Sequence, residues 1–131
     1  MPIKNRAQFF GSQWDLDLLS KNLGGRRAFS DIDAMTERRG KFLLIEFKHR
    51  NAGTIPIGQA ILLKRFSELG DGHATALVVW GEPDRPVFAQ IYNRGECGNR
   101  FAITEELLHN LIGRWDAWAD TPDEPDNSLG G

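Results

Sequence analysis

The sequence predicts an α/β fold in which a mixed sheet is flanked by helices. Short runs of β-branched and aromatic residues, typical of strands, alternate with segments whose apolar residues recur every three or four positions, as in helices. The predicted order is helix, strand, strand, helix, strand, strand, helix, which is the mixed order of an α/β protein. The 131 residues, 40% of them hydrophobic, are enough for one domain with its own core.

The first predicted helix covers residues 12–23. Ser12 is its candidate N-cap, and Asp15 stands three residues later, in the position that the acidic partner of a capping box takes. Gly24 and Gly25 end the helix, because glycine readily adopts the conformation that follows a helix C-terminus.

A β-hairpin is predicted over residues 27–49. Its turn is polar and contains Gly40, which can take a positive φ, and apolar runs lie on both sides. A two-residue loop at Arg39 and Gly40 places Arg38 opposite Lys41. Each further pair then steps one residue outward on both strands.

This register places Asp33 opposite Glu46 and Asp31 opposite Lys48. Residues two apart on a strand share a face, so all four side chains gather on one side of the hairpin. A slip of one residue would send the two aspartates to the other face, so the prediction depends on the register.

Three carboxylates and one ammonium leave a surplus of negative charge in this group. Glu46 also interrupts residues 42–47, which are otherwise apolar enough for a buried strand, and a buried carboxylate needs a partner. A hard divalent cation such as Mg²⁺ or Mn²⁺ would be that partner. The alternative is a solvated hairpin face on which Glu46 and Lys48 form an ordinary surface pair.

A second helix is predicted from Thr54 or Ile55 to Leu69, with Pro56 in its first turn. One face of this helix carries Gln59, Leu62, Leu63 and Phe66. The polar amide of Gln59 therefore falls at the buried N-terminal end of the helix. The helix connects the strand of Glu46 to the next strand as a right-handed crossover if these two strands are parallel.

The rest of the chain predicts two further strands, a helix and a tail. The strands cover residues 73–80 and 87–92 and are joined by a turn. The last helix covers residues 104–118 and completes a domain that spans residues 1–118. Residues 119–131 are rich in Pro, Asp and Gly, and we expect a disordered acidic tail there.

The net charge of −2 does not indicate a nucleic-acid-binding protein, but the charge is unevenly distributed. Residues 119–131 hold four acids and no base, whereas residues 1–50 hold ten Lys and Arg against six Asp and Glu. The bases that flank the acidic group in the sequence are Arg26, Arg27, Arg38, Arg39, Lys41 and Arg50. They would form a rim that holds a phosphate backbone, or simply a solvated basic face.

Cys97 is the one cysteine, which excludes an internal disulfide and a cysteine-rich metal site. No apolar run approaches the length of a membrane span, and the first residues lack the apolar region of a signal peptide. We therefore expect a cytoplasmic protein that does not bind membranes.

Several of these features together resemble the PD-(D/E)XK nuclease superfamily. They are Ile32-Asp33 before a hairpin turn, Glu46-Phe47-Lys48 in an apolar strand, and Gln59 on the next helix. The Gln59 position is similar to that in Holliday-junction-resolvase-like and phage or archaeal members, and residues 11–15 resemble the opening of some members. The resemblance covers about residues 11–80 and implies a restriction-endonuclease-like αβββαβ core.

The resemblance also implies a role for each matching residue. Asp33 and Glu46 would bind the metal, Mg²⁺ or Mn²⁺, with Asp15 and Phe47 as further metal-site residues and Asp31 auxiliary. Lys48 would orient or deprotonate the attacking water. Gln59 would position Lys48 or the metal-bound water.

The leading hypothesis is a Mg²⁺-dependent endonuclease that hydrolyses phosphodiester bonds in DNA, with structured or branched DNA among its substrates. The alternative is a non-cutting module with the nuclease fold, such as a phage or mobile-element protein that acts on DNA or on another protein. A third hypothesis is a nuclease that works as a homodimer, since cutting two strands takes two sites. Trp115 and Trp118 could form its docking face, or pack in the core.

Overall fold

The computed structural model describes residues 14–123, which fall in two compact units, Met1–Asp31 and Ile32–Gly131. The described part of the first unit contains one short helix, α2 (Leu16–Ser20). Its N-cap is Asp15, whose carboxylate accepts the N–H of Leu18 at 3.1 Å. The helix is shorter than predicted, and the predicted N-cap, Ser12, lies outside the described residues.

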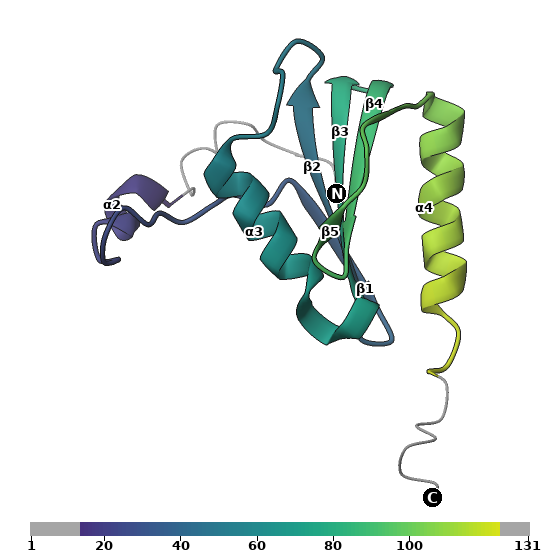
Figure 1. Cartoon of the computed structure of the whole chain (residues 1–131), viewed down its shortest axis with the longest axis horizontal. Helices are drawn as coiled ribbons and strands as arrows, with labels where there is room; N and C mark the ends of the chain where they lie inside the picture. Colours follow the sequence, from purple (N-terminus) through teal and green to yellow (C-terminus); the bar gives the residue numbers. More distant parts are fainter. Residues whose placement is uncertain (1–13, 124–131) are drawn as a thin grey trace, which may run out of the picture. The chain divides into compact units, whose positions relative to one another are not determined.

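The described part of the second unit contains the sheet and two α-helices (Figure 1). The elements are β1 (Ala34–Arg38), β2 (Lys41–His49), α3 (Ile57–Ser67), the 3₁₀ helix η1 (Leu69–Gly72), β3 (Ala74–Glu82), β4 (Arg85–Asn93), β5 (Glu96–Cys97), β6 (Phe101–Ala102) and α4 (Glu105–Ala119). The strand order is β1-β2-β3-β4-β5, with β6 also paired to β4. Strands β2 and β3 are parallel and the other pairs are antiparallel. The predicted α/β class with a mixed, helix-flanked sheet is confirmed.

The hairpin has the predicted turn and the predicted register. Arg38 pairs with Lys41, and the ladder continues to Ala34 opposite Ile45. Arg39 and Gly40 both have positive φ, 53° and 79°, as a two-residue type I′ loop requires. The predicted length of the first strand is wrong, because β1 begins at Ala34 rather than near residue 27.

Helix α3 makes the connection between the parallel strands β2 and β3, as predicted. Pro56 is its N-cap residue, one position before the first helical residue. This position suits proline, whose missing N–H has no partner to lose at a helix start. Leu63 on α3 is fully buried, but Leu62 is exposed. The prediction that Leu62 lies on the buried face of this helix is therefore wrong.

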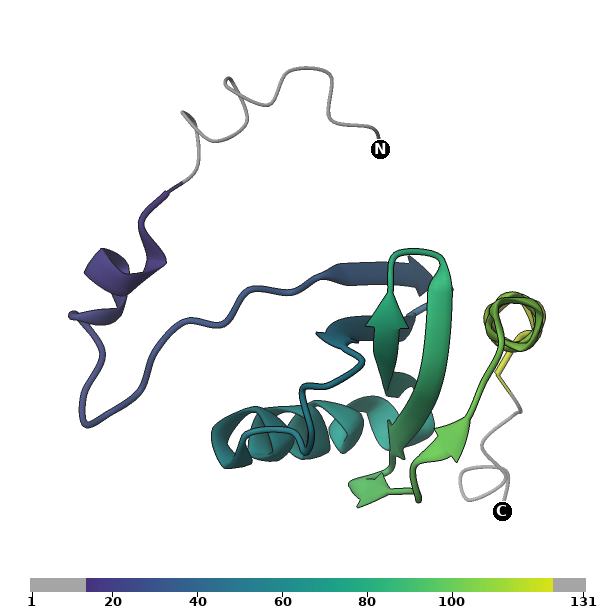
Figure 2. The same cartoon turned by 90° about the horizontal axis from the view of Figure 1, so that it is seen from above.

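The two faces of the sheet are covered by different helices. Side chains alternate along β2, so Leu43 and Ile45 face one side and Leu44 and Glu46 face the other. Helix α4 packs on the Leu43 side and α3 packs on the Leu44 side. Figure 2 shows these two helices on opposite sides of the sheet. Glu46 is therefore placed on the α3 face.

Helix α4 begins after Thr104, whose hydroxyl accepts the N–H of Leu107 at 3.2 Å, as the sequence predicts. Trp115 packs against the core, and Trp118 lies edge-on to His73 at 6.4 Å between ring centroids. Ala119 is fully buried, and residues 119–123 continue in contact with the hairpin turn. The rest of the predicted tail, residues 124–131, lies outside the described residues. Among residues 14–123, no helix is long and apolar enough to cross a membrane.

Candidate metal centre

Asp33 ends the hairpin ladder. It is the residue before β1, and its Oδ2 accepts the main-chain N–H of Phe47 at 2.8 Å. In a longer antiparallel ladder this N–H would bond to the carbonyl of Ile32. The carboxylate of Asp33 takes the place of that carbonyl, which gives a physical reason for the start of β1 at Ala34.

Glu46 lies in the next register position and is only 6% exposed. Burial raises the pKa of its carboxyl group, and the negative charge of Asp33 raises this pKa further. A hydrogen bond from the main chain of Asp33 and the charge of Lys48 act in the opposite direction. The two carboxylates are therefore close enough for the charge of Asp33 to affect the pKa of Glu46 in β2.

Gln59 reaches this pair from the first turn of α3. Its Nε2 donates a hydrogen bond to Oε2 of Glu46 at 3.1 Å, which holds the carboxylate in place. Its Oε1 is also buried but has no hydrogen-bond donor within the described part of the chain. A buried acceptor without a donor is costly, so this oxygen is a ready site for a water or an ammonium group.

Lys48 shares the α3 face with Glu46, two residues along β2. Its charge is close enough to lower the pKa of Glu46, and no carboxylate lies within salt-bridge distance of it between residues 14 and 123. Four predicted site residues, Asp33, Glu46, Lys48 and Gln59, are therefore brought together. Asp31 does not pair with Lys48 on the hairpin, because β1 begins three residues later, at Ala34.

Asp15 and Phe47 were also predicted at the metal. Asp15 belongs to the first unit, where it caps α2, and its assignment to the metal stays a prediction. The main-chain N–H of Phe47 points towards Asp33, so its carbonyl lies on the same open edge of β2. Phe47 can therefore offer one main-chain oxygen beside the two carboxylates.

The two carboxylates and the Phe47 carbonyl are few ligands for a metal ion, but oxygen is the ligand atom that Mg²⁺ prefers. In the described range, no group of three or more His, Cys, Asp or Glu side chains is placed to hold a metal ion. Mg²⁺, however, commonly binds through one or two carboxylates and completes its octahedron with waters and substrate phosphate. The pair Asp33 and Glu46 with the Phe47 carbonyl fits that pattern.

The predicted basic rim is wrong for the residues of the hairpin turn. Arg38 pairs with Asp116 at 2.6 Å and Asp120 at 3.0 Å, at the far end of β2 from Glu46. The ammonium group of Lys41 is buried and donates to the carbonyls of Ala119 and Thr121 at 3.2 and 2.7 Å. These two cations bind groups at the C-terminal end of α4, where free carbonyls attract positive charge.

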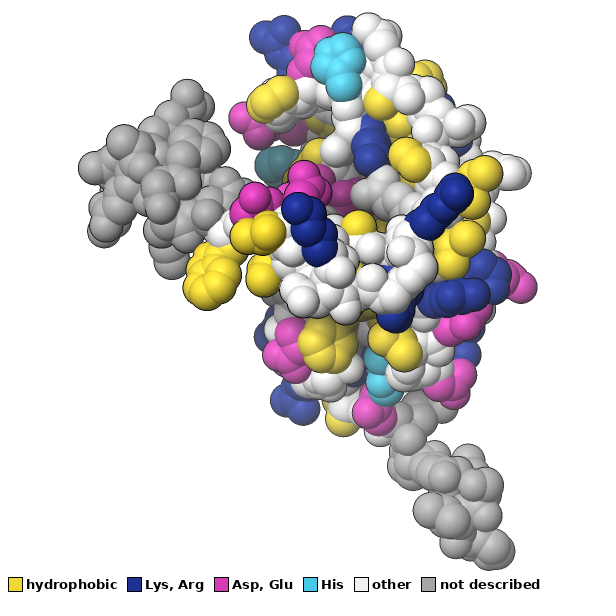
Figure 3. Space-filling view, turned by 90° about the vertical axis from the view of Figure 1, so that its left-hand side faces the viewer, with side chains coloured by type: hydrophobic (Ala, Val, Ile, Leu, Met, Phe, Trp, Pro, Cys, Tyr) yellow, Lys and Arg dark blue, Asp and Glu magenta, His cyan; other side chains and the backbone are white. Residues whose placement is uncertain are grey.

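The other predicted rim residues are also partly engaged. Arg39 pairs with Asp120 at 3.2 Å and Arg50 with Glu82 at 3.7 Å, whereas Arg27 donates to the carbonyl of Gly24 within the first unit. On the side of the described chain shown in Figure 3, Lys and Arg side chains are scattered among acidic and hydrophobic ones. Charge counting along the sequence did not anticipate this arrangement.

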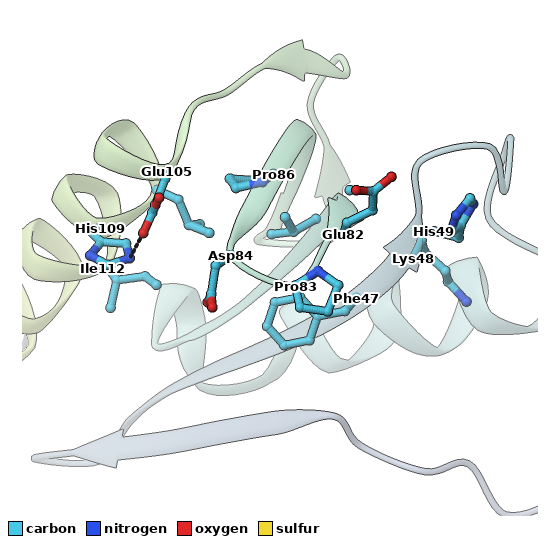
Figure 4. Close-up of a pocket in the computed structure, with 13 residues that line it drawn as sticks. Phe47, Lys48, His49, Glu82, Pro83, Asp84, Pro86, Glu105, His109 and Ile112 are labelled. Carbon is cyan, nitrogen blue, oxygen red and sulfur yellow. Dashed lines mark ion pairs between the residues drawn. The ribbon is translucent and has the colours of Figure 1, made fainter.

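A pocket of about 630 Å³ lies on the other face of the sheet and was not predicted (Figure 4). Phe47 and Pro83 line one part of it, and Leu108 and Ile112 of α4 line another. The pair Glu105 and His109, 4.0 Å apart, stands at its border. Residues that line the pocket come from segments distant in the sequence. The one sequence feature that points to it is the alternation of side chains along β2, which places Phe47 on the face opposite Glu46.

No protein-family model, curated protein or solved structure matches this chain. The arrangement offers two acceptor carboxylates for a hard cation, an ammonium group on the same face, and an amide that touches one carboxylate. Groups of these kinds can assist the hydrolysis of a charged substrate.

Proposed function

We propose that the chain is a metal-dependent endonuclease that hydrolyses phosphodiester bonds in DNA. The observation that carries the proposal is the buried carboxylate of Glu46, which accepts a hydrogen bond from Gln59 and lies near the charges of Asp33 and Lys48. It agrees with the resemblance of the same residues to the PD-(D/E)XK nucleases.

Asp33 and Glu46 would hold Mg²⁺ or Mn²⁺, together with the carbonyl of Phe47. A bound divalent ion offsets the charge on phosphoryl oxygens and acidifies a water. The protein contributes the position of the two carboxylates. The hairpin ladder sets Asp33 beside Glu46, and the amide of Gln59 fixes the orientation of Glu46.

Lys48 has a different role in the proposal. Its ammonium group donates hydrogen bonds to the attacking water or to an oxygen of the scissile phosphate, where negative charge grows in the transition state. The Oε1 atom of Gln59 accepts from the same water or from Lys48, which would satisfy its hydrogen-bonding capacity. Lys48 and Gln59 thereby orient the nucleophile relative to the two carboxylates.

The partners follow from this chemistry. A cut through both strands of a duplex takes two sites, so the proposal includes a homodimer on duplex or branched DNA. It also includes a cytoplasmic location, which the single cysteine, Cys97, favours.

The test is incubation of the purified chain with supercoiled, linear, single-stranded and four-way-junction DNA, with Mg²⁺ or Mn²⁺ and with EDTA. We expect cleavage of at least one substrate that requires the divalent ion and is lost in Glu46→Ala. Absence of cleavage with every substrate, or equal cleavage by Glu46→Ala, would refute the proposal.

A non-cutting module with the same fold is the second candidate. It is favoured by the neutralisation of Arg38, Arg39 and Lys41, which leaves fewer cations for a DNA backbone. Calorimetric titration with Mn²⁺ separates the two candidates. A folded chain that binds no Mn²⁺ would be the non-cutting module, whereas binding that needs Asp33 and Glu46 supports the nuclease.

A further inference from the structure

A second cation lies on the α3 face of the sheet, held there by aromatic rings. The guanidinium of Arg100, in the segment between β5 and β6, lies 4.0 Å from the ring centre of Trp80 and 4.8 Å from that of Phe88. Trp80 is 1% exposed, so Arg100 covers a buried ring, while Arg100 itself is exposed. The two ring contacts restrict the position of the charged group.

The strand register relates Arg100 to the proposed site. Lys48 is the neighbour of Trp80 across β2 and β3, and Trp80 is the neighbour of Phe88 across β3 and β4. Neighbouring residues of a sheet share a face, and adjacent strands are about 4.8 Å apart. Lys48, Trp80 and Phe88 therefore form a row across the α3 face, with Arg100 stacked over its aromatic members.

Arg100 differs from several other arginines of the second unit in its contacts. Arg38, Arg39, Arg50 and Arg94 each pair with a carboxylate. Within residues 14–123, Arg100 has no carboxylate partner, and its guanidinium donates no hydrogen bond to another described residue. A cation–π contact needs no hydrogen bond from the guanidinium, so its N–H groups stay able to donate.

We propose that Arg100 binds a phosphate group of the DNA backbone, next to the phosphate that Lys48 contacts. A planar guanidinium held by stacking has lost part of its conformational freedom before binding and can donate two N–H groups to one phosphate. The inference rests on the proposed function for the identity of the substrate, and it adds a residue that positions the nucleic acid. The aromatic rings hold Arg100, and its charged group binds the phosphate.

The test measures binding of a fluorescein-labelled DNA duplex by anisotropy at several KCl concentrations, with Ca²⁺ in place of Mg²⁺. In B-form DNA, each phosphate that a protein neutralises contributes about 0.9 to the magnitude of the slope of log K against log salt. We expect a decrease of about this size, with roughly tenfold weaker binding at low salt, for Arg100→Gln. Arg100→Lys keeps the charge and should keep most of the slope.

Arg114→Gln is the matched control, because it removes the same charge from an exposed position on α4, which covers the other face. Arg100→Met keeps an apolar contact with Trp80 and should behave like Arg100→Gln. Thermal unfolding of each variant verifies that the chain is folded. Should Arg100→Gln unfold at the assay temperature, Arg100→Met serves as the neutral variant.

A wild-type slope in the folded neutral variants, or an equal decrease in Arg114→Gln, would overturn the inference. The proposed function fails separately. If the chain binds DNA through Arg100 but cuts nothing with Mg²⁺ or Mn²⁺, the role of Arg100 stands and the nuclease proposal fails. If the chain cuts DNA while Arg100→Gln binds normally, only the role of Arg100 fails. Wild type that binds no DNA would contradict both.

Discussion

The carboxylate of Asp33 accepts the main-chain N–H of Phe47 at 2.8 Å, where a longer β1 would supply a carbonyl. The same carboxylate raises the pKa of Glu46, the next residue of β2 beyond the last ladder pair. Asp33 therefore ends the hairpin and creates the negative potential of the proposed metal site. These two roles can be separated by mutation.

Asp33→Asn keeps an oxygen that can accept the Phe47 N–H, but it removes the negative charge. We expect its free energy of unfolding to stay near wild type while Mn²⁺ binding is lost in calorimetry. Asp33→Ala removes both roles and should destabilise the chain by about 1 kcal/mol as well, because the N–H loses its partner. Equal Mn²⁺ affinity in Asp33→Asn and wild type would contradict the role of this charge.

The raised pKa of Glu46 predicts a pH-dependent cost to folding. A carboxyl group with a raised pKa holds its proton more tightly in the folded chain. Its contribution is therefore most favourable below the ordinary value of 4.5 and is lost as pH rises through the folded-state pKa. Glu46→Gln removes this titration. In EDTA we expect its melting temperature to exceed that of wild type at neutral pH, with the gap closing towards acid pH.

Wild type and Glu46→Gln should also differ in their response to a divalent ion. Mn²⁺ should raise the melting temperature of wild type at neutral pH, because an ion that binds only the folded chain stabilises it. Glu46→Gln should show little of this rise. A gap that widens towards acid pH, or an equal response to Mn²⁺, would contradict the assigned environment of Glu46.

Gln59 is expected to position Glu46 and the attacking water rather than to contact the DNA. Gln59→Leu removes the hydrogen bond to Oε2 of Glu46, and supporting residues of this kind typically contribute about 10–100-fold in metal affinity or activity. Cleavage rates over a range of Mg²⁺ concentrations would show the loss, with partial recovery at high Mg²⁺. Exposed Leu62→Ala on the same helix is the control and should leave the rate unchanged.

We expect the side chain of Lys41 to stabilise the fold, and we expect its replacement to leave DNA binding unchanged. Lys41→Met removes the two hydrogen bonds to Ala119 and Thr121, and we expect a loss of about 2 kcal/mol in urea unfolding. Arg39→Ala, which breaks an exposed pair with Asp120, should cost about 1 kcal/mol or less. If DNA binding by folded Lys41→Met depended less on salt than binding by wild type, Lys41 would contact a phosphate, as the predicted basic rim requires.

The hairpin was the part of the fold most open to prediction from sequence. A two-residue loop determines every pair that follows, so the turn at Arg39 and Gly40 was enough to place Asp33 beside Glu46. Side-chain alternation then put Lys48 on the same face. The position of Gln59 followed from the helical period and the parallel pairing of β2 with β3.

The contacts of the turn were out of reach of the same reasoning. Arg38 and Lys41 meet acids and carbonyls about eighty residues later, at the end of α4. Charge patterns record neighbours in the sequence, and such a contact leaves no local pattern. The stacking of Arg100 on Trp80 and Phe88 was missed for the same reason, since it depends on how β6 returns to β4.

The most direct test of the proposed metal site is a crystal structure of the chain grown with Mn²⁺, with data collected at the manganese absorption edge. The proposal predicts an anomalous peak between the carboxylates of Asp33 and Glu46, about 2 Å from an oxygen of each. An ordered site with no peak there, at Mn²⁺ concentrations that support cleavage, would contradict it.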